Sequence, residues 1–164
     1  MALYADLPTV TVSVEVDASP SALWPLISDI NMPARFSGEF QGATWTEPHT
    51  GPALGARFVG TNQHPAIGEW NVPCSVAVYQ PDVAFGWDPG GPDAPFAKWR
   101  FTLEPHGSQT TLVFSGQMGF GPSGLTAAIE ARPDREEQIV DRRLEEWRTN
   151  MTATAEGIKQ LAEA

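Results

Sequence analysis

Residues 9–30, TVTVSVEVDASPSALWPLISDI, contain the signals that decide the fold. From residue 9 to residue 17, valines alternate with polar residues without exception. Successive side chains of an extended chain point to opposite faces, so this alternation places all the valines on one face. The pattern predicts a strand with one buried and one exposed face.

A helix is predicted directly after this strand. Ser19 suits the N-cap position, where its hydroxyl accepts a backbone N–H, and Pro20 suits the first turn, where no N–H is needed. Pro25 and Pro33 each remove a hydrogen bond from a helix interior. We therefore expect two short, angled helical segments that end near Phe36.

Six short runs rich in aromatic and β-branched residues follow, and turn residues separate them. Their connections are too short for crossover helices, so the runs predict an antiparallel meander. The predicted strands cover residues 39–47, 55–64, 70–80, 83–88, 96–104 and 109–120.

The region from residue 124 to residue 164 differs in character, because it holds 15 of the chain's 30 charged side chains. Its apolar residues recur at steps of three and four, which predicts a long amphipathic helix over residues 134–162. A shorter helical segment is expected over 123–131, before Pro133. We interpret the charged residues of this region as a solvated helix face. The apolar stripe comprises Val140, Leu144, Trp147, Met151, Ala155, Ile158 and Ala162.

These elements predict one α+β domain over residues 1–164. A seven-stranded antiparallel sheet would wrap around the long C-terminal helix, with two short helices after the first strand. The length of 164 residues is that of a single domain, and 41% hydrophobic residues suffice for an ordinary core.

The amino-acid composition excludes several classes of partner and location. Ten Lys and Arg against 20 Asp and Glu give a net charge of −10, which repels phosphate backbones, so no nucleic-acid partner is expected. No apolar run approaches the ~18 residues of a membrane span. One cysteine, Cys74, cannot form an internal disulfide, and no signal-peptide pattern precedes the first strand. We expect a cytoplasmic protein and leave a homodimer open as its assembly.

The order of elements resembles the START-related, birch-pollen-allergen-like superfamily (SRPBCC), and within it the polyketide cyclase/dehydrase-like branch. The resemblance covers nearly the whole chain and implies a helix-grip fold around an apolar cavity. Members include aromatase/cyclases, lipid and hormone binders, and carriers, so family membership does not specify the chemistry. It rests on SPSALWPLISDI (19–30), GARFVGTNQ (55–63), FGW (85–87), WRFTLEP (99–105) and GIKQLAE (157–163).

Alternation along the predicted strands defines one inner face that is large and aromatic. Such a face suits flat, apolar ligands, and its residues also serve as core. We expect a small hydrophobic or aromatic, polyketide- or lipid-like ligand. The expected contacts are Phe58, Trp70, Trp87, Trp99, Phe101, Phe114, Met118, Val140, Leu144 and Trp147.

Asn62 and His64 are the only polar side chains predicted on this inner face, about 7 Å apart along one strand. We place His64 opposite Trp70, which puts Cys74 opposite Gly60 and too far from His64 for a nucleophile pair. In an enzyme, Asn62 would polarise a carbonyl and His64 would move a proton. Alternatively, both residues lie at a strand end and face solvent or cap the hairpin.

Three connections should meet at one end of the meander and form the mouth of the cavity, because alternate connections fall on the same side. They are PAIGE (65–69), DPGGPDAP (88–95) and GPSG (121–124).

Two classes of function remain open from the sequence. One is a cyclase or dehydratase that folds a reactive chain by confinement, and the other is a non-catalytic carrier or sequestering protein. Few titratable groups are predicted to point inward, which favours binding, and the inward histidine keeps catalysis open. The chain shows no cofactor fingerprint and no metal-ligand spacing of histidines, so neither a cofactor nor a metal ion is expected.

Overall fold

The computed structural model describes residues 2–164. Its helices are α1 (Pro20–Ile27), α2 (Gly124–Ala131) and α3 (Glu136–Glu163), with short 3-10 turns at η1 (Tyr4–Asp6), η2 (Pro33–Arg35) and η3 (Pro133–Arg135). Its strands are β1 (Thr9–Val16), β2 (Phe40–Trp45), β3 (Arg57–His64), β4 (Gly68–Gln80), β5 (Ala84–Pro89), β6 (Ala97–His106) and β7 (Gln109–Met118).

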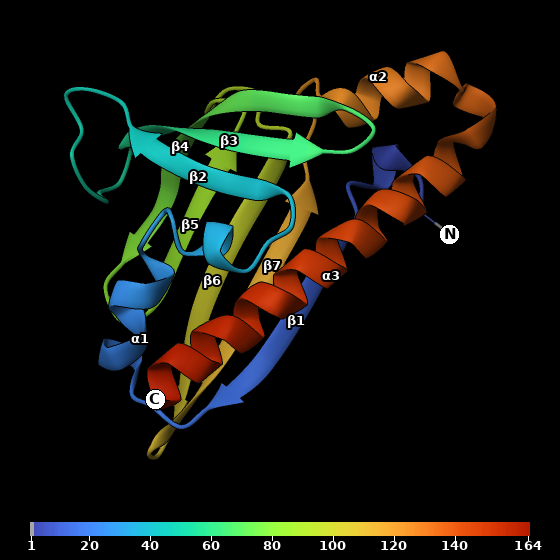
Figure 1. Cartoon of the computed structure of the whole chain (residues 1–164). Helices are drawn as coiled ribbons and strands as arrows, with labels where there is room; N and C mark the ends of the chain where they lie inside the picture. Colours follow the sequence, from blue (N-terminus) through green and yellow to red (C-terminus); the bar gives the residue numbers. More distant parts are fainter. Residues whose placement is uncertain (1) are drawn as a thin grey trace.

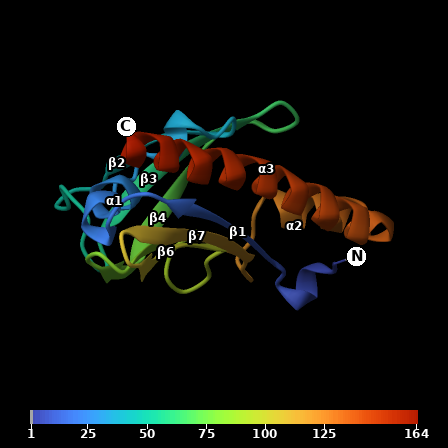
Figure 2. The same cartoon turned by 90° about the horizontal axis from the view of Figure 1, so that it is seen from below.

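These strands form one antiparallel sheet in the order β1-β7-β6-β5-β4-β3-β2. Strands β2 to β7 are a meander, and β1 pairs with β7 to complete the sheet. Helix α3 lies along one face of the sheet, as the two views show (Figures 1 and 2). The predicted α+β fold, with the sheet packed on a long C-terminal helix as in helix-grip proteins, is confirmed.

The core lies between the sheet and α3. On β1, Val10 and Val16 are buried while the intervening polar residues face outward. On α3, Val140, Met151 and Ile158 are fully buried at helical spacing, as predicted. Each such side chain contributes about 1.5–3 kcal/mol of hydrophobic stabilisation. No helix within residues 2–164 is both long and apolar enough to span a membrane.

Two short helical segments follow β1, as predicted, and Pro25 lies inside the first of them. The Ser19 hydroxyl accepts the Ala22 N–H at 3.2 Å and caps α1 as expected, and the helix continues through Pro25 to Ile27. Pro25 removes only one backbone hydrogen bond, and the buried side chains of Leu23 and Ile27 hold the helix on the core. The second helical segment is the 3-10 turn η2, which ends just before Phe36.

The predicted register between β3 and β4 is wrong by two residues. Asn62 lies opposite Trp70, and His64 lies opposite Gly68. The hairpin closes with three loop residues instead of five, because Gly68 adopts φ 89°, the left-handed conformation that such a short loop requires. A shift of two preserves which side chains face inward, so Cys74 still points into the core, opposite Phe58.

Candidate functional site

An inner cavity of about 140 Å³ lies between the sheet and α3. A cavity of roughly 150 Å³ holds one benzene ring, so this space fits a single aromatic ring. Five of the expected ligand contacts line it, namely Trp70, Trp87, Trp99, Phe114 and Trp147, and Phe40 and Phe96 complete its aromatic wall.

An outer groove of about 460 Å³ adjoins the inner cavity. The β3–β4 hairpin contributes Ala66 and Ile67 to it, the start of α2 contributes Ser123 and Gly124, and α3 forms a further side. The two spaces share Trp70, Phe96, Arg143 and Trp147. The hairpin and the turn before α2 therefore meet at one end, as predicted for the cavity mouth. The 88–95 loop reaches the same place, since the Gly121 N–H donates to the Pro95 carbonyl at 3.0 Å.

Trp99 is at the centre of the aromatic wall. Its ring centroid lies 4.6 Å from that of Trp147 and 6.5 Å from that of Trp87, at an interplanar angle of 27° to Trp87. The absence of a side chain at Gly116 makes this position possible, because a Cβ there would lie 2.4 Å from the Trp99 ring. Gly116 thus sets the width of the inner cavity.

The other five expected contacts line neither space. Four of them belong to the closed core, where Phe101, for example, stacks on Phe114 at 4.0 Å between centroids. Alternation identifies the face on which a side chain lies but not whether that side chain borders empty space or is covered by neighbouring side chains. The residues in question are Phe58, Phe101, Met118 and Val140, which are buried, and Leu144, which is half-buried against the core.

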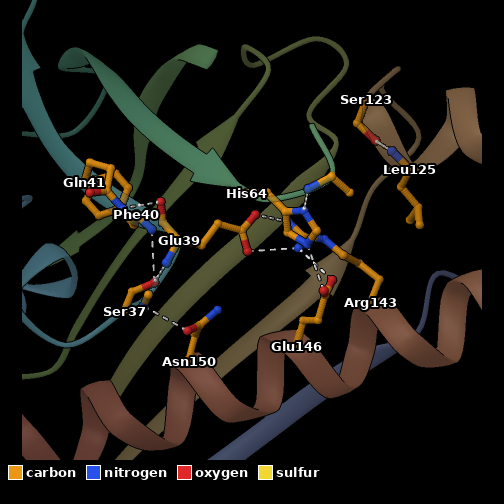
Figure 3. Close-up of polar contacts among 12 residues, drawn as sticks. Ser37, Glu39, Phe40, Gln41, His64, Ser123, Leu125, Arg143, Glu146 and Asn150 are labelled. Atoms are coloured by element: carbon orange, nitrogen blue, oxygen red, sulfur yellow. Dashed lines mark hydrogen bonds and ion pairs between the residues drawn. The ribbon is translucent and has the colours of Figure 1, made fainter. Parts of the chain in front are cut away.

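A polar network lies where the two spaces meet, and Figure 3 shows its members facing one another above α3. The Arg143 guanidinium donates two hydrogen bonds to the Glu39 carboxylate, at 2.9 and 2.5 Å. It donates a third to Glu146 at 3.1 Å. His64 Nε2 contacts the other Glu146 oxygen at 2.8 Å. The network therefore joins the start of β2, the end of β3 and the helix α3.

The hydrogen bonds of His64 define its tautomer. The Ala66 N–H donates to Nδ1 at 3.0 Å, so the proton of the neutral ring resides on Nε2, which donates to Glu146. His64 thus caps the hairpin, as the structural alternative has it, and also ties the hairpin to α3. Asn62, two residues before His64 on β3, is half-buried and lines the inner cavity, and no side-chain hydrogen bond of its amide occurs within residues 2–164.

Sequence reasoning missed Glu39, Arg143 and Glu146. We interpreted the charged residues of α3 as a solvated face, but the Arg143 side chain is only 23% exposed. A signal was present, since Arg143 stands three residues after Val140 and four before Trp147, which places it on the inward stripe. Burial alone lowers the pKa of Arg143, and the Glu39 and Glu146 carboxylates outweigh it and raise the pKa.

Glu146 is expected to make the stability of the fold depend on pH. Burial alone raises its pKa, but hydrogen bonds from His64 and Arg143 outweigh this and lower it below the ordinary value. Because the folded pKa is below the unfolded value of about 4.3, this stability is complete above that pH and is lost as pH falls through the folded pKa. We expect urea midpoints from pH 7 to pH 3 to fall less steeply for Glu146→Gln than for the natural chain. Parallel curves would contradict this assignment.

Cys74 lines the inner cavity but is not suited to nucleophilic chemistry. Burial raises the pKa of its thiol to about 12, so it is protonated at neutral pH. It pairs with Phe58, six residues from His64 along β3, which is about 20 Å at ~3.4 Å per residue. This separation agrees with the prediction that Cys74 and His64 form no nucleophile pair.

Comparison with solved structures supports this description of the fold. A Polyketide_cyc-like protein from Corynebacterium glutamicum is 26% identical, with a TM-score of 0.66 over 94% of this chain and 91% of that one. The di-domain ARO/CYC protein BexL reaches a TM-score of 0.71 at 14% identity, over 96% of this chain and 50% of BexL. A Thermus thermophilus protein gives 0.63 at 11% identity over 96% and 100% of the two chains. A search of curated proteins found no match.

The fold and the cavity together define a helix-grip protein with an interior apolar chamber. Residues 8–157 match the family described as polyketide cyclase/dehydrase and lipid transport. The chain belongs to this family, which confirms the resemblance found in the sequence.

Proposed function

We propose that the chain binds a small apolar or aromatic molecule, with one ring in the inner cavity and the remainder in the outer groove. The observation that carries this proposal is the continuous aromatic wall. Trp70 and Trp147 border both spaces, while Trp87 and Trp99 close the inner one. Aromatic rings gain from stacking and edge contacts with such a wall in addition to the burial of their area. Membership of a family described by cyclisation and lipid transport agrees with it.

Native mass spectrometry of the freshly purified protein tests this proposal, because a retained ligand reveals its class. Quenching of tryptophan fluorescence by added aromatic or lipid-like ligands then measures the affinity. We expect Gly116→Val to weaken binding about tenfold or more, since the new side chain displaces the Trp99 ring into the cavity. Gly51→Ala is the control, because a Cβ there would meet no atom within 4 Å and Gly51 lines neither the inner cavity nor the outer groove. Unchanged affinity in Gly116→Val, or no binding of any such ligand, would refute the proposal.

Catalysis of cyclisation or dehydration is the second candidate, and the free amide of Asn62 favours it. This amide can donate to a carbonyl oxygen as negative charge develops there. His64 would transfer the proton, although the Nδ1 lone pair is already used by Ala66 and the Nε2 proton by Glu146. Turnover that His64→Ala abolishes while ligand affinity is retained would support this candidate. Full activity in that variant would oppose it.

A further inference from the structure

At the junction of the inner cavity and the outer groove, carboxylates already neutralise the positive charge of Arg143. Its guanidinium is held by both oxygens of Glu39 and by one oxygen of Glu146. Among the described residues that line the inner cavity, only Glu39 and Arg143 carry a charge. Since His64 donates to Glu146 as a neutral ring, two carboxylates surround one guanidinium. The network therefore carries one net negative charge.

Glu39 retains capacity to accept further hydrogen bonds. A carboxylate offers about four lone-pair positions, and Arg143 occupies one on each oxygen of Glu39. The Glu39 side chain is 12% exposed and lines the inner cavity, so a molecule inside the cavity is the partner within reach of the remaining positions. Asn62 borders the same cavity. It pairs with Phe40, the residue that follows Glu39, so Asn62 and Glu39 lie near each other.

We infer that the ligand carries a neutral hydroxyl group on its ring and that Glu39 selects it. The hydroxyl would donate to the Glu39 carboxylate and accept from the Asn62 amide. A ligand carboxylate at the same point would add a third negative group to a network with one positive charge, and a bare ring would leave these polar groups without partners. The inference deepens the proposed function and rests on it.

Arg142 is a second cation near this junction. It borders the outer groove, but it is exposed and does not line the inner cavity. A ring seated in the inner cavity presents its substituent to Glu39 and Arg143 instead. Arg142 therefore provides a matched control, as a cation at the groove that takes no part in the selection.

Equilibrium dialysis at pH 7 with three naphthalene probes tests the inference. The probes are 2-naphthol, which offers a neutral hydroxyl, 2-methoxynaphthalene, which keeps the oxygen without the donor, and 2-naphthoate, which is anionic. We expect 2-naphthol to bind about tenfold or more tightly than either of the others, the effect of one hydrogen bond to a charged group. In Glu39→Gln the preference for 2-naphthol over 2-naphthoate should shrink, because fewer negative charges then neutralise Arg143 and repel the anionic probe. In Arg142→Gln it should persist.

The outcomes separate the inference from the proposed function. Equal binding of all three probes, or tightest binding of 2-naphthoate, overturns the selection by Glu39 and leaves the cavity as a ligand site. A preference that persists in Glu39→Gln also overturns it. If no probe binds, the proposed function fails and the inference fails with it.

Discussion

Replacing Trp147 by alanine is expected to lower the free energy of unfolding by about 3–5 kcal/mol, the range for truncation of a buried tryptophan. Trp147 is 7% exposed, and its ring lies 4.6 Å from the Trp99 ring between centroids. Its removal would merge the inner cavity with new empty space that the sheet cannot close. A loss of this size is a large share of the roughly 5–15 kcal/mol that stabilises a typical domain.

Urea denaturation followed by far-ultraviolet circular dichroism measures this loss. Arg148→Ala is the control, since Arg148 is the next residue on α3 and is exposed, so its replacement should change stability by no more than about 0.5 kcal/mol. A loss below about 1 kcal/mol for Trp147→Ala would show that α3 does not press this ring onto Trp99.

Arg143→Met is expected to cost about 2–3 kcal/mol. Breaking a fully buried ion pair costs about 3–5 kcal/mol because one charge is left without a partner. The estimate is lower here because the side chains of Arg143, Glu39 and Glu146 are 23%, 12% and 29% exposed, and solvent screens them in part. The remaining loss comes mainly from Glu39, whose carboxylate would lose its ion-pair partner at the wall of an aromatic cavity.

The double variant Arg143→Met with Glu39→Gln should recover most of this loss, because no uncompensated carboxylate remains at Glu39. Arg142→Met serves as the control for a cation on the same helix, and its exposed side chain should leave the urea midpoint nearly unchanged. Equal losses in the single and double variants would show that Arg143 stabilises the fold by packing alone.

The candidate site was predictable in its apolar part. Trp70, Trp87, Trp99, Phe114 and Trp147 could be placed on one inner surface because strand alternation and helical spacing are properties of the local chain. Which of the inward residues border empty space could not be read from the same patterns. Phe101 and Met118 share the face of Trp99 but are covered completely by other side chains, as where Phe114 stacks on Phe101.

The polar part of the site was harder to foresee. Arg143 binds Glu39 across 104 positions of sequence, and His64 binds Glu146 across 82. Glu39 and Glu146, viewed in their own segments, resemble ordinary solvated charges. Arg143 and His64 lie on inward faces, but their own segments do not reveal their partners. Only the approach of α3 to the ends of β2 and β3 turns them into one network.

The sequence by itself determined the order of the elements, the buried face of each strand and the inward stripe of α3. These features follow from periods of two and about 3.6 residues, which a short segment displays without reference to the rest of the chain. The tertiary structure alone decided the register of Asn62 opposite Trp70, the close approach of the Trp99 ring to Gly116 and the partners of Arg143. The physical reason is that each of these depends on how closely two distant segments approach, and that distance is set by packing of the whole domain.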